Sequence, residues 1–531
     1  MNWKIVNIDA SDIQSQYGTG VLTSKLLKAS SLSSEQMEEL LRGEERLFTS
    51  HAECVIRACE RILRAKQNNE KVMIAGDYDA DGICSTAIMK KTLDMLEIVN
   101  GYYIPDRFKE GYGLSAETVT AAYQKGYTLI ITVDNGVKAH QALLKAKEYG
   151  IDVIVTDHHT IEEEIEAPIV VHPQYMEEDF AYLSGAGVAL EISRNLIGEA
   201  DDERVTLCAV ALIGDVMPLW RETRKIVKCG LQLLRRGIPR SLSTLVYPAT
   251  SAEEIDVAFS IVPKLNSVGR LNDRSNVNTL VQYLLCKDQN AIQSYSNALN
   301  NVNRKRKQLS EKMTVIAKEK MNEDKLPVIY DSSFHEGICG LVAGKIANEY
   351  HRPVVVMAEN GEVYKGSGRS VPGFNMFDFF SDFEEKQSFG GHPAAIGISI
   401  KKEDMSLFLE KVQKKMETNP FTYEEPEKTA IVIDPNCIDF DSIADLSCLS
   451  PYPKDMIEPN FVVENPIVLC KKETTGTVRY TIDCGHCKLD AVVYKNRGLY
   501  CPDILLRVIG TLKINHFRGI VSLQMIVEDL M

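Results

Sequence analysis

Three aspartates at alternate positions in a glycine-bounded segment are the residues of this sequence best suited to hold a metal. They are Asp77, Asp79 and Asp81, within Gly-Asp-Tyr-Asp-Ala-Asp-Gly at 76–82. Alternate residues of an extended segment point the same way, and carboxylates brought that close repel unless divalent cations neutralise them. Because hard oxygen ligands select Mg²⁺ or Mn²⁺, the segment predicts a site for one of these ions.

The same spacing occurs in EF-hand calcium loops, which have a glycine at the sixth position. Gly82 is sixth from Asp77, but the twelfth position, where an EF-hand needs glutamate, is Ile88. The run before the loop, 72–75, is apolar and strand-like, whereas an EF-hand has a helix there. We therefore favour a metal site at the end of a buried strand.

Two further apolar runs rich in β-branched residues end in groups of the same kind. Asp134 follows the first run, and Asp157, His158 and His159 follow the second. Such runs, alternating with amphipathic segments, predict βαβ units on a parallel sheet. Ligands of open α/β sheets bind outside the carboxyl ends of the strands, so these side chains are expected to meet the three aspartates there.

A further acid, Asp215, follows a mostly apolar, helix-like segment. One interpretation is an N-cap for the next helix. Buried charges normally pair or coordinate metal, however. With Asp-His-His and other carboxylates nearby, we favour Asp215 as a metal ligand over the cap.

Taken in order, Asp-x-Asp-x-Asp-Gly, Val-Asp-Asn-Gly and Asp-His-His resemble the motifs of the DHH phosphoesterase superfamily. Segments 104–115 and 263–270, with Gly-Gly-His at 390–392, are similar to its RecJ branch, and the resemblance runs from about residue 50 to the C-terminus. RecJ proteins are exonucleases that degrade single-stranded DNA from the 5′ end. The resemblance implies a metal-dependent 5′ to 3′ exonuclease that releases mononucleotides in DNA repair and recombination.

The resemblance also implies a centre of two Mn²⁺ or Mg²⁺ ions that activate a water for hydrolysis. Many superfamily members have a histidine where this chain has Ala75, and Asp77 is the candidate to substitute for it. Asp134 is the expected bridge between the ions. The expected ligands are Asp77, Asp79, Asp81, Asp134, His158 and Asp215.

Catalytic and substrate-binding roles follow from the same resemblance. His159 is expected to contact the scissile phosphate or the leaving oxygen, and Asp157 to fix the tautomer of a ligating imidazole. The loop 366–370 offers amides, hydroxyls and a guanidinium suited to a terminal phosphate. The expected substrate-binding residues are Arg107, Asn266, Arg270, Ser367, Arg369, Ser370 and His392.

The elements that must position these residues predict an α/β protein of several domains. The resemblance implies a parallel-sheet DHH domain, a long connecting helix, a second α/β domain similar to the DHH-associated domain, and a C-terminal β-barrel of the OB type, which binds single strands. The chain of 531 residues accordingly divides into an N-terminal segment (1–50), a DHH catalytic domain (51–285), a connecting helix (286–322), a DHH-associated domain (323–420) and an OB-fold-like domain (421–531).

The net charge of −14 is unusual for a protein that binds a polyanion, because phosphate binding is driven by Lys and Arg. What matters is whether basic residues concentrate along one groove. The run Arg-Lys-Arg-Lys at 304–307 lies on the predicted connecting helix. It is either part of such a groove or a solvated helix face.

Thirteen cysteines without regular spacing favour reduced thiols. No apolar run approaches the roughly 18 residues of a membrane span, and the N-terminus lacks the apolar core of a signal peptide. A cytoplasmic monomer that does not bind membranes is expected. The resemblance implies single-stranded DNA as the partner, with a single-strand-binding protein and a helicase as further candidates.

Two other functions stay open. A DHH phosphodiesterase acting on short oligoribonucleotides or cyclic dinucleotides has the same centre, but normally lacks a terminal barrel and the connecting helix. A noncatalytic single-strand-binding replication scaffold loses metal ligands, which this chain retains. Sequence patterns therefore favour the exonuclease.

Overall fold

The computed structural model describes residues 2–43, 46–108, 110–198, 202–271, 275–517 and 519–531. Its contacts divide the chain into two units. Unit 1 contains Met1–Arg46, Pro218–Arg221 and Glu425–Met531, and unit 2 contains Leu47–Met217 and Glu222–Glu424. The chain therefore passes between the units four times, at 46/47, 217/218, 221/222 and 424/425. In the part of the chain that the structure describes, no helix has the length and apolarity needed to cross a membrane.

Unit 2 begins with a five-stranded parallel sheet. Its spatial order is β3 (Asn100–Tyr103), β2 (Val72–Ala75), β4 (Leu129–Thr132), β5 (Asp152–Thr156) and β6 (Ile169–Val171). Strands β2 and β4 are buried along their whole length, as expected for apolar strands covered on both faces. The chain runs from β2 to β3 and then returns to β4 on the other side of β2. Because α/β sheets bind ligands where the strand order reverses, the end of β2 and β4 is the expected site.

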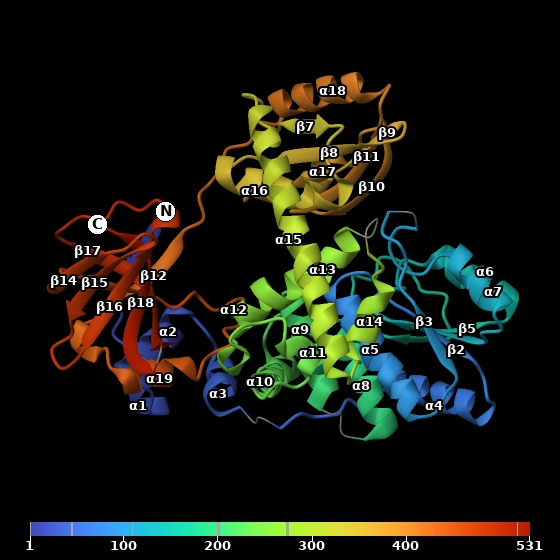
Figure 1. Ribbon diagram of the computed structural model, residues 1–531, viewed down its shortest axis with the longest axis horizontal. Helices are drawn as coiled ribbons and strands as arrows, with labels where there is room; N and C mark the ends of the chain where they lie inside the picture. The colour runs from blue at the N-terminus through green and yellow to red at the C-terminus, as the bar shows by residue number, and fades with distance from the viewer. Residues whose placement is uncertain (1, 44–45, 109, 199–201, 272–274, 518) are drawn as a thin grey trace. The chain divides into compact units, whose positions relative to one another are not determined.

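Helices cover this sheet on both sides (Figure 1). On one side, α6 (Ala116–Gln124) and α7 (His140–Tyr149) pack over a core that includes Met73 and Ala75 of β2. The helices that contact the strands from the other side are α4 (Glu53–Gln67), α5 (Ala80–Met95) and α8 (Gly185–Ile197). Further along come α9 (Asp202–Gly214), α10 (Arg221–Arg235), α11 (Arg240–Ser243), α12 (Glu254–Asp256), α13 (Val262–Arg270) and α14 (Asn278–Leu284).

A long helix, α15 (Gln289–Glu319), follows and confirms the predicted connecting helix. Its start is capped by the Asp288 side chain, which accepts a hydrogen bond from the Ala291 amide at 2.7 Å. Along its length α15 contacts α13 and α14, and it also contacts α16 (Glu336–Tyr350). It therefore joins the parallel-sheet part of unit 2 to a second α/β part.

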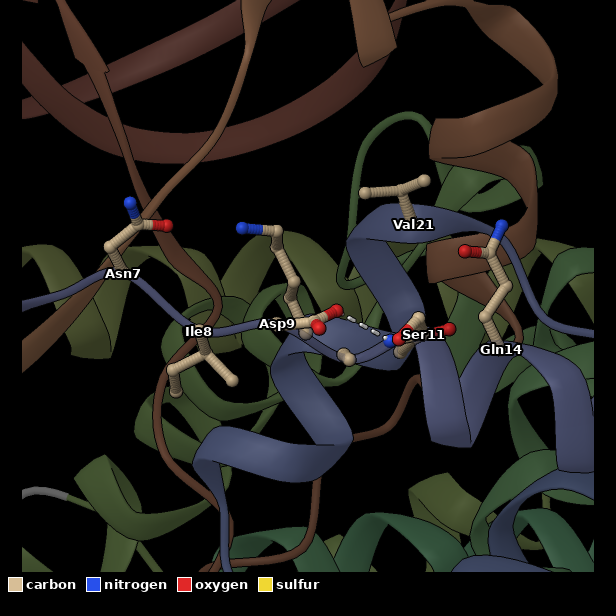
Figure 2. A pocket seen from close by; sticks show the side chains of 9 residues that line it. Asn7, Ile8, Asp9, Ser11, Gln14 and Val21 are labelled. Carbon is tan, nitrogen blue, oxygen red and sulfur yellow. Dashed lines mark hydrogen bonds between the residues drawn. The ribbon is translucent and has the colours of Figure 1, made fainter.

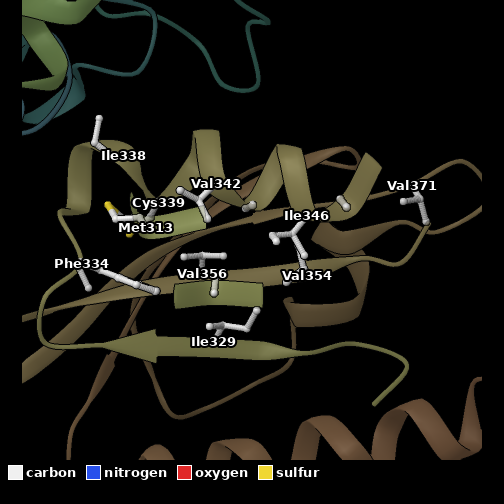
Figure 3. Close-up of a cluster of buried hydrophobic side chains, with 14 of the residues drawn as sticks. Met313, Ile329, Phe334, Ile338, Cys339, Val342, Ile346, Val354, Val356 and Val371 are labelled. Atoms are coloured by element: carbon white, nitrogen blue, oxygen red, sulfur yellow. The ribbon is translucent and has the colours of Figure 1, made fainter. Parts of the chain in front are cut away.

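The second α/β part has a sheet in the order β10 (Lys386–His392), β11 (Ala395–Lys401), β9 (Val363–Arg369), β8 (Val354–Asn360) and β7 (Val328–Asp331). Only β7 and β8 pair in parallel. Figure 3 shows Val342 and Ile346 of α16 facing Val354 and Val356 of β8 across a buried core. A second core, which includes residues of α17 (Met376–Phe380) and α18 (Met405–Thr418), completes this part.

Unit 1 is built on an eight-stranded sheet. In spatial order its strands are β1 (Trp3–Val6), β12 (Lys428–Val432), β13 (Asn460–Glu464), β17 (Arg507–Phe517), β18 (Ile520–Leu530), β16 (Lys488–Tyr494), β15 (Thr477–Asp483) and β14 (Val468–Glu473). Its helices are α1 (Ser11–Tyr17), α2 (Val21–Ala29), α3 (Ser34–Arg42) and α19 (Phe440–Ser447). The predicted N-terminal segment (1–50) does not stand apart, because its strand β1 pairs with β12 and Met1–Arg46 group with Glu425–Met531 in unit 1. Because β12, the partner of β1, lies more than 400 residues further along the chain, no local sequence pattern predicts this pairing.

A cavity of about 410 Å³ opens beside α1 and α2 in unit 1 (Figure 2). It is lined by both charge signs, from Asp9 and Lys25, and by small polar groups such as Ser24. The Ser11 amide donates to Asp9 Oδ1 at 3.0 Å, as the dashed line marks. None of the predicted site residues is among its lining residues.

Candidate metal centre

The predicted ligands meet at the carboxyl ends of β2, β4 and β5. Three sets of ligand atoms each lie within 4.8 Å of one another: Asp77, Asp79 and Asp134; Asp81, His158 and Asp215; and Asp134, His158 and His159. The structure thus brings all six predicted ligands together and adds His159. Asp134 and His158 each belong to two sets, which is the arrangement that two neighbouring ions would need.

Several atoms of this cluster are buried without a hydrogen-bond partner among the described residues. They are Asp77 Oδ1, Asp134 Oδ1 and His158 Nε2. The imidazole Nε2 of His158 lies 3.2 Å from Asp134 Oδ1, 3.5 Å from Asp215 Oδ2 and 3.7 Å from Asp81 Oδ2. Burying such atoms unpaired is costly, and carboxylate with imidazole is a ligand set for divalent ions. The residues present therefore fit a metal centre.

Burial and the crowding of carboxylates raise the pKa values of several acids in this cluster. Burial, with the charges of Asp81 and Asp79, raises the pKa of Asp134 well above its usual value. Burial and Asp79 act in the same direction on the pKa of Asp77, and the pKa of Asp215 rises to about 7, chiefly because of burial. The protein alone does not stabilise these negative charges, and bound cations would.

Asp79 has a local reason to lie where it does. It is the N-cap of α5, and its Oδ1 accepts hydrogen bonds from the amides of Asp81, at 3.0 Å, and Gly82, at 3.1 Å. Aspartate is a preferred cap because it satisfies amides that the first helical turn leaves free. The same motif therefore ends a strand, starts a helix and points acids at the site.

Asp81 is held by the start of α8, which the sequence patterns did not reveal. Its carboxylate accepts hydrogen bonds from Ser184 Oγ at 3.0 Å and from the amides of Gly185 and Ala186 at 2.8 Å each. A Cβ on Gly185 would lie 2.4 Å from Asp134 Cβ, so only glycine permits this approach. The available signal was Ser-Gly-Ala at the start of an apolar helical segment.

The turn after β4 is fixed by the asparagine of Val-Asp-Asn-Gly. Asn135 Nδ2 donates to the carbonyls of Ala75, at 3.0 Å, and Val133, at 2.9 Å, while its Oδ1 accepts from the Leu114 amide at 3.1 Å. Asp134 itself has φ 62°, a left-handed conformation that aspartate tolerates better than most residues. Asn135 is thus the clamp that holds Asp134 in this conformation.

Asp157 supports a different histidine from the one expected. Its Oδ1 lies 2.8 Å from His159 Nδ1 and accepts from the His158 amide at 2.8 Å, and its Oδ2 accepts from the Val137 amide at 3.0 Å. The side chain therefore orients His159 rather than the imidazole of His158. Burial opposes protonation of His159, but the hydrogen bond and charge of Asp157 outweigh it and raise the pKa of His159. Asp157 thus holds the His159 ring in place beside the predicted metal ligands.

Tyr112 is a site residue that the sequence patterns missed. Its hydroxyl donates to the main-chain carbonyl of Asp134 at 2.6 Å, and its ring packs edge-on against His159 and Tyr78, with centroids 5.7 and 6.3 Å away. Arg107 lies over the Tyr78 ring at 5.0 Å. The available signal was a tyrosine between two glycines, a composition suited to a loop that presents an aromatic ring.

A cavity of about 220 Å³ adjoins the metal ligands. It is lined by Asp77, Tyr78, Asp79, Arg107, Tyr112, Asn266 and Arg270. Three of the predicted substrate-binding residues are therefore in place beside the acids. Asn266 also has a structural contact, because its Oδ1 accepts a hydrogen bond from the Ala80 amide at 2.7 Å.

Four arginines, from three elements and one loop, converge near this cavity. Burial lowers the pKa of Arg270 to about 10. The positive charges that add to this shift come from Arg107, Arg369 and Arg306. Arg306 belongs to the basic run of α15, where it is half-buried and bonded to Asn303 at 2.6 Å, while the other three basic residues of the run are exposed. Of the two interpretations of that run, Arg306 fits the groove and its neighbours fit the solvated face.

The other predicted substrate-binding residues differ in burial and in whether their polar groups are already hydrogen-bonded. Ser367 and Arg369 lie on β9 and are half-buried. Ser370 Oγ donates to a main-chain carbonyl four residues on, at 2.5 Å, so its hydroxyl is engaged. His392 is exposed at the end of β10 and belongs to none of the three ligand sets. It lies near Glu162, whose pKa is lowered mainly by Lys138 and to a smaller extent by His392.

Comparison with known proteins agrees with this architecture. The models for the DHH family N-terminal domain, the DHHA1 domain and the RecJ OB domain match residues 71–213, 323–418 and 429–529. Fold and site together define a DHH-type phosphoesterase with an added OB domain. The single-stranded-DNA-specific exonuclease RecJ of Bacillus subtilis (strain 168) is 31% identical over 558 residues, covering 100% of this chain and 70% of the relative. The chain belongs to the RecJ family.

Solved structures are similar in the same way. RecJ from Thermus thermophilus in complex with Mn²⁺ has a TM-score of 0.84 at 24% identity, and the match covers 100% of this chain and 79% of that one. An exonuclease RecJ bound to manganese has a TM-score of 0.62 at 29% identity, over 70% of this chain and 96% of that one. The first likeness concerns the fold, and it includes the C-terminal strands of unit 1.

Proposed function

We propose that this chain is a metal-dependent exonuclease that hydrolyses single-stranded DNA from the 5′ end to mononucleotides, in DNA repair and recombination. The observation that carries the proposal is the cluster of acids and imidazoles joined by a cavity to half-buried arginines. Family membership supports the substrate, because the Bacillus subtilis relative is named a single-stranded-DNA-specific exonuclease. The manganese-bound relative supports Mn²⁺ or Mg²⁺ as the cofactor.

The residues divide the chemistry between them. We assign two ions to Asp77, Asp79, Asp81, Asp134, His158 and Asp215. Such a pair supplies water activated at neutral pH and neutralises charge on the leaving oxygen. His159, oriented by Asp157, would donate a hydrogen bond to an oxygen of the scissile phosphate and so stabilise charge that grows during the reaction.

The arginine cluster accounts for a 5′ end rather than an internal position. A phosphate monoester carries about −1.5 to −2 charges at pH 7, whereas a phosphodiester carries one. Burial, and after it the positive charges of Arg107 and Arg369, lower the pKa of Arg270, so a bound anion would stabilise this cluster. Arg369 and Ser367 on β9 complete this grip from the second α/β part, so a terminal phosphate is bound more strongly than an internal one.

Digestion of end-labelled strands with Mn²⁺ tests the proposal. The assay compares 5′ and 3′ labels, 5′-phosphate and 5′-hydroxyl ends, DNA and RNA, and the Asp134→Ala variant. We expect 5′-labelled DNA to release labelled mononucleotide from the first time point, and the variant to be inactive. If short RNA is consumed and long DNA is untouched, the proposal fails and a DHH phosphodiesterase takes its place.

The remaining expectations belong to the same proposal. We assign single-strand binding to the OB domain of unit 1 and a cytoplasmic location, for which thirteen cysteines in the thiol form are suited. A monomeric state, and a single-strand-binding protein and a helicase as partners, stay predictions. Size-exclusion chromatography with light scattering checks the first of these.

A further inference from the structure

His172 is a buried histidine that belongs to none of the three ligand sets. It directly follows β6, an edge strand of the parallel sheet, and its side chain caps the start of the 3₁₀ turn η1 (Pro173–Tyr175). Its Nδ1 lies 3.1 Å from the Gln174 amide nitrogen, and its Nε2 lies 2.9 Å from the main-chain carbonyl oxygen of His159. The ring therefore connects a strand end to the residue that we expect at the scissile phosphate.

These two hydrogen bonds determine which nitrogen of His172 carries the proton. A backbone N–H only donates, so Nδ1 must accept from the Gln174 amide, and a carbonyl oxygen only accepts, so the Nε2–H donates to His159. Capping the turn requires an acceptor only. The bond from Nε2 to His159 therefore has no part in starting η1, and the side chain has a second use.

His159 lies in a segment without regular structure of its own. Residues 157–168, all of which the structure describes, form no helix or strand between β5 and β6. On one side Asp157 Oδ1 accepts a hydrogen bond from the His159 amide at 3.2 Å and lies 2.8 Å from its Nδ1. On the other side His172 binds the carbonyl. Because β5 and β6 are paired neighbours, two adjacent strand ends hold the backbone of His159 before and after its Cα.

We propose that His172 is a positioning residue for His159. By holding the carbonyl it fixes the peptide plane that follows His159, so that Asp157 keeps the imidazole in one direction. Donors stabilise developing charge best when they are already in place, and a misplacement of about 1 Å can cost on the order of 100-fold in rate. The inference rests on the role of His159 in the proposed function, and it adds the residue that secures this role.

Two substitutions separate the donor from the cap. His172→Phe keeps a planar ring without donor or acceptor, whereas His172→Gln places an amide N–H near the position of Nε2 but has no acceptor at that of Nδ1. Both variants lose the cap, so the donor distinguishes them. With 5′-phosphorylated single-stranded DNA and Mn²⁺, we expect the kcat of His172→Phe to fall about 10–100-fold at an unchanged KM. His172→Gln is expected to keep the kcat of the wild type.

His159→Ala supplies the background that distinguishes positioning from a general effect on folding. If His172 acts through the His159 side chain, adding His172→Phe to His159→Ala should not lower kcat further, because the group that it positions is already gone. An equal loss in both backgrounds, or wild-type kcat in His172→Phe, would overturn the proposal. A matching fall in Mn²⁺ affinity, measured without DNA, would also overturn it, since His172 would then act through the predicted ligand His158.

A second measurement, without DNA or metal, follows the His159 ring itself. In protein labelled with ¹⁵N at its 10 histidines, an imidazole N–H bonded to a carboxylate is protected from exchange with water. The His159 signal is identified by its absence from His159→Ala. We expect it in the wild type and in His172→Gln, and its loss in His172→Phe.

The two possible failures give different results. A wild-type spectrum without the His159 signal, or a signal that His172→Phe leaves unchanged, would contradict the positioning role. Failure of the proposed function appears instead as a wild type that releases no mononucleotides from single-stranded DNA, while the His159 signal still depends on His172.

Discussion

At the scale of single residues, the centre stores unfavourable electrostatic energy. Asp134 is 2% exposed, and burial together with the charges of four other aspartates raises its pKa well above its usual value. Asp134 cannot move away from these acids, because the close approach of Gly185 and the hydrogen bonds of Asn135 fix its position. The ligand set is therefore a source of instability until cations bind.

This predicts that removing one charge stabilises the protein without metal. In EDTA, Asp134→Asn is expected to have a higher unfolding midpoint than the wild type. Its free energy of unfolding should be larger by on the order of 1–2 kcal/mol, because a buried charge of like sign is gone. Added Mn²⁺ should then raise the midpoint of the wild type more than that of the variant. Calorimetry with and without Mn²⁺ checks this, and a lower midpoint of the variant in EDTA would contradict it.

At the scale of elements, α16 brings two arginines together through glycines. A Cβ on Gly337 would lie 2.1 Å from the Arg270 carbonyl oxygen, and one on Gly340 would lie 2.9 Å from Arg369 Nη2. The glycines of this helix therefore leave room for Arg270 and Arg369, the residues of the proposed phosphate grip, although glycine lowers helix propensity. Arg369 can yield to a methyl group by moving its guanidinium, which separates its function from folding.

Gly340→Ala is predicted to weaken the grip while the helix gains stability. We expect the KM for 5′-phosphorylated single-stranded DNA to rise about tenfold, the cost of disturbing one charge-assisted hydrogen bond. Thermal stability should rise by up to about 1 kcal/mol. Steady-state kinetics and thermal unfolding measure the two effects.

Gly344→Ala is the matched control on the same helix. The atom closest to an added Cβ there is Arg369 Cγ, at 4.0 Å, an ordinary contact. It should gain similar stability and keep the KM of the wild type. A similar KM increase in both variants would assign the effect to the helix as a whole and not to Arg369.

At the scale of the whole molecule, buried charges tie two of the four chain crossings together within unit 2. Glu191 Oε2 accepts from the Ser50 amide at 2.7 Å and its Oε1 accepts from Arg194 at 3.0 Å. Glu222 accepts from the Phe48 amide at 2.8 Å. The two segments with which the chain enters unit 2, at residues 47 and 222, are thus held by one cluster of charged side chains.

This cluster predicts a pH dependence of stability. Burial raises the pKa of Glu191 to about 7 from 4.5. Because the folded state favours the neutral acid, its contribution is complete below about pH 4.5 and is lost as pH rises through about 7. Relative to the wild type, Glu191→Gln should therefore become more stable between pH 5 and pH 8, by on the order of 1–3 kcal/mol.

Urea unfolding at several pH values measures that difference directly. Glu191→Gln keeps the size and an amide oxygen that can accept the Ser50 amide, so packing is preserved. A stability difference between variant and wild type that stays constant over this pH range would show that Glu191 remains ionised in the folded protein.

Much of the architecture and the ligand set could be predicted from sequence, because the signals are local. Asp77, Asp79 and Asp81 directly follow a buried strand, and Asp134 and His158 follow others, so a parallel sheet necessarily gathers them at one edge. The long helix from 289 to 319 has few breaks and a capping aspartate. Strand β1 could not be assigned, because its pairing with β12 depends on long-range closure.

The sequence by itself predicted which acids and imidazoles gather at one edge of a sheet, where the structure brings them together. Tertiary structure alone decided that Ser184 and Gly185 hold Asp81, that Asp157 holds His159, that Arg306 and not its neighbours turns inward, and that Trp220 belongs to unit 1. The physical reason is that strand periodicity is written in neighbouring residues, whereas hydrogen bonds between segments form only after the chain has closed on itself.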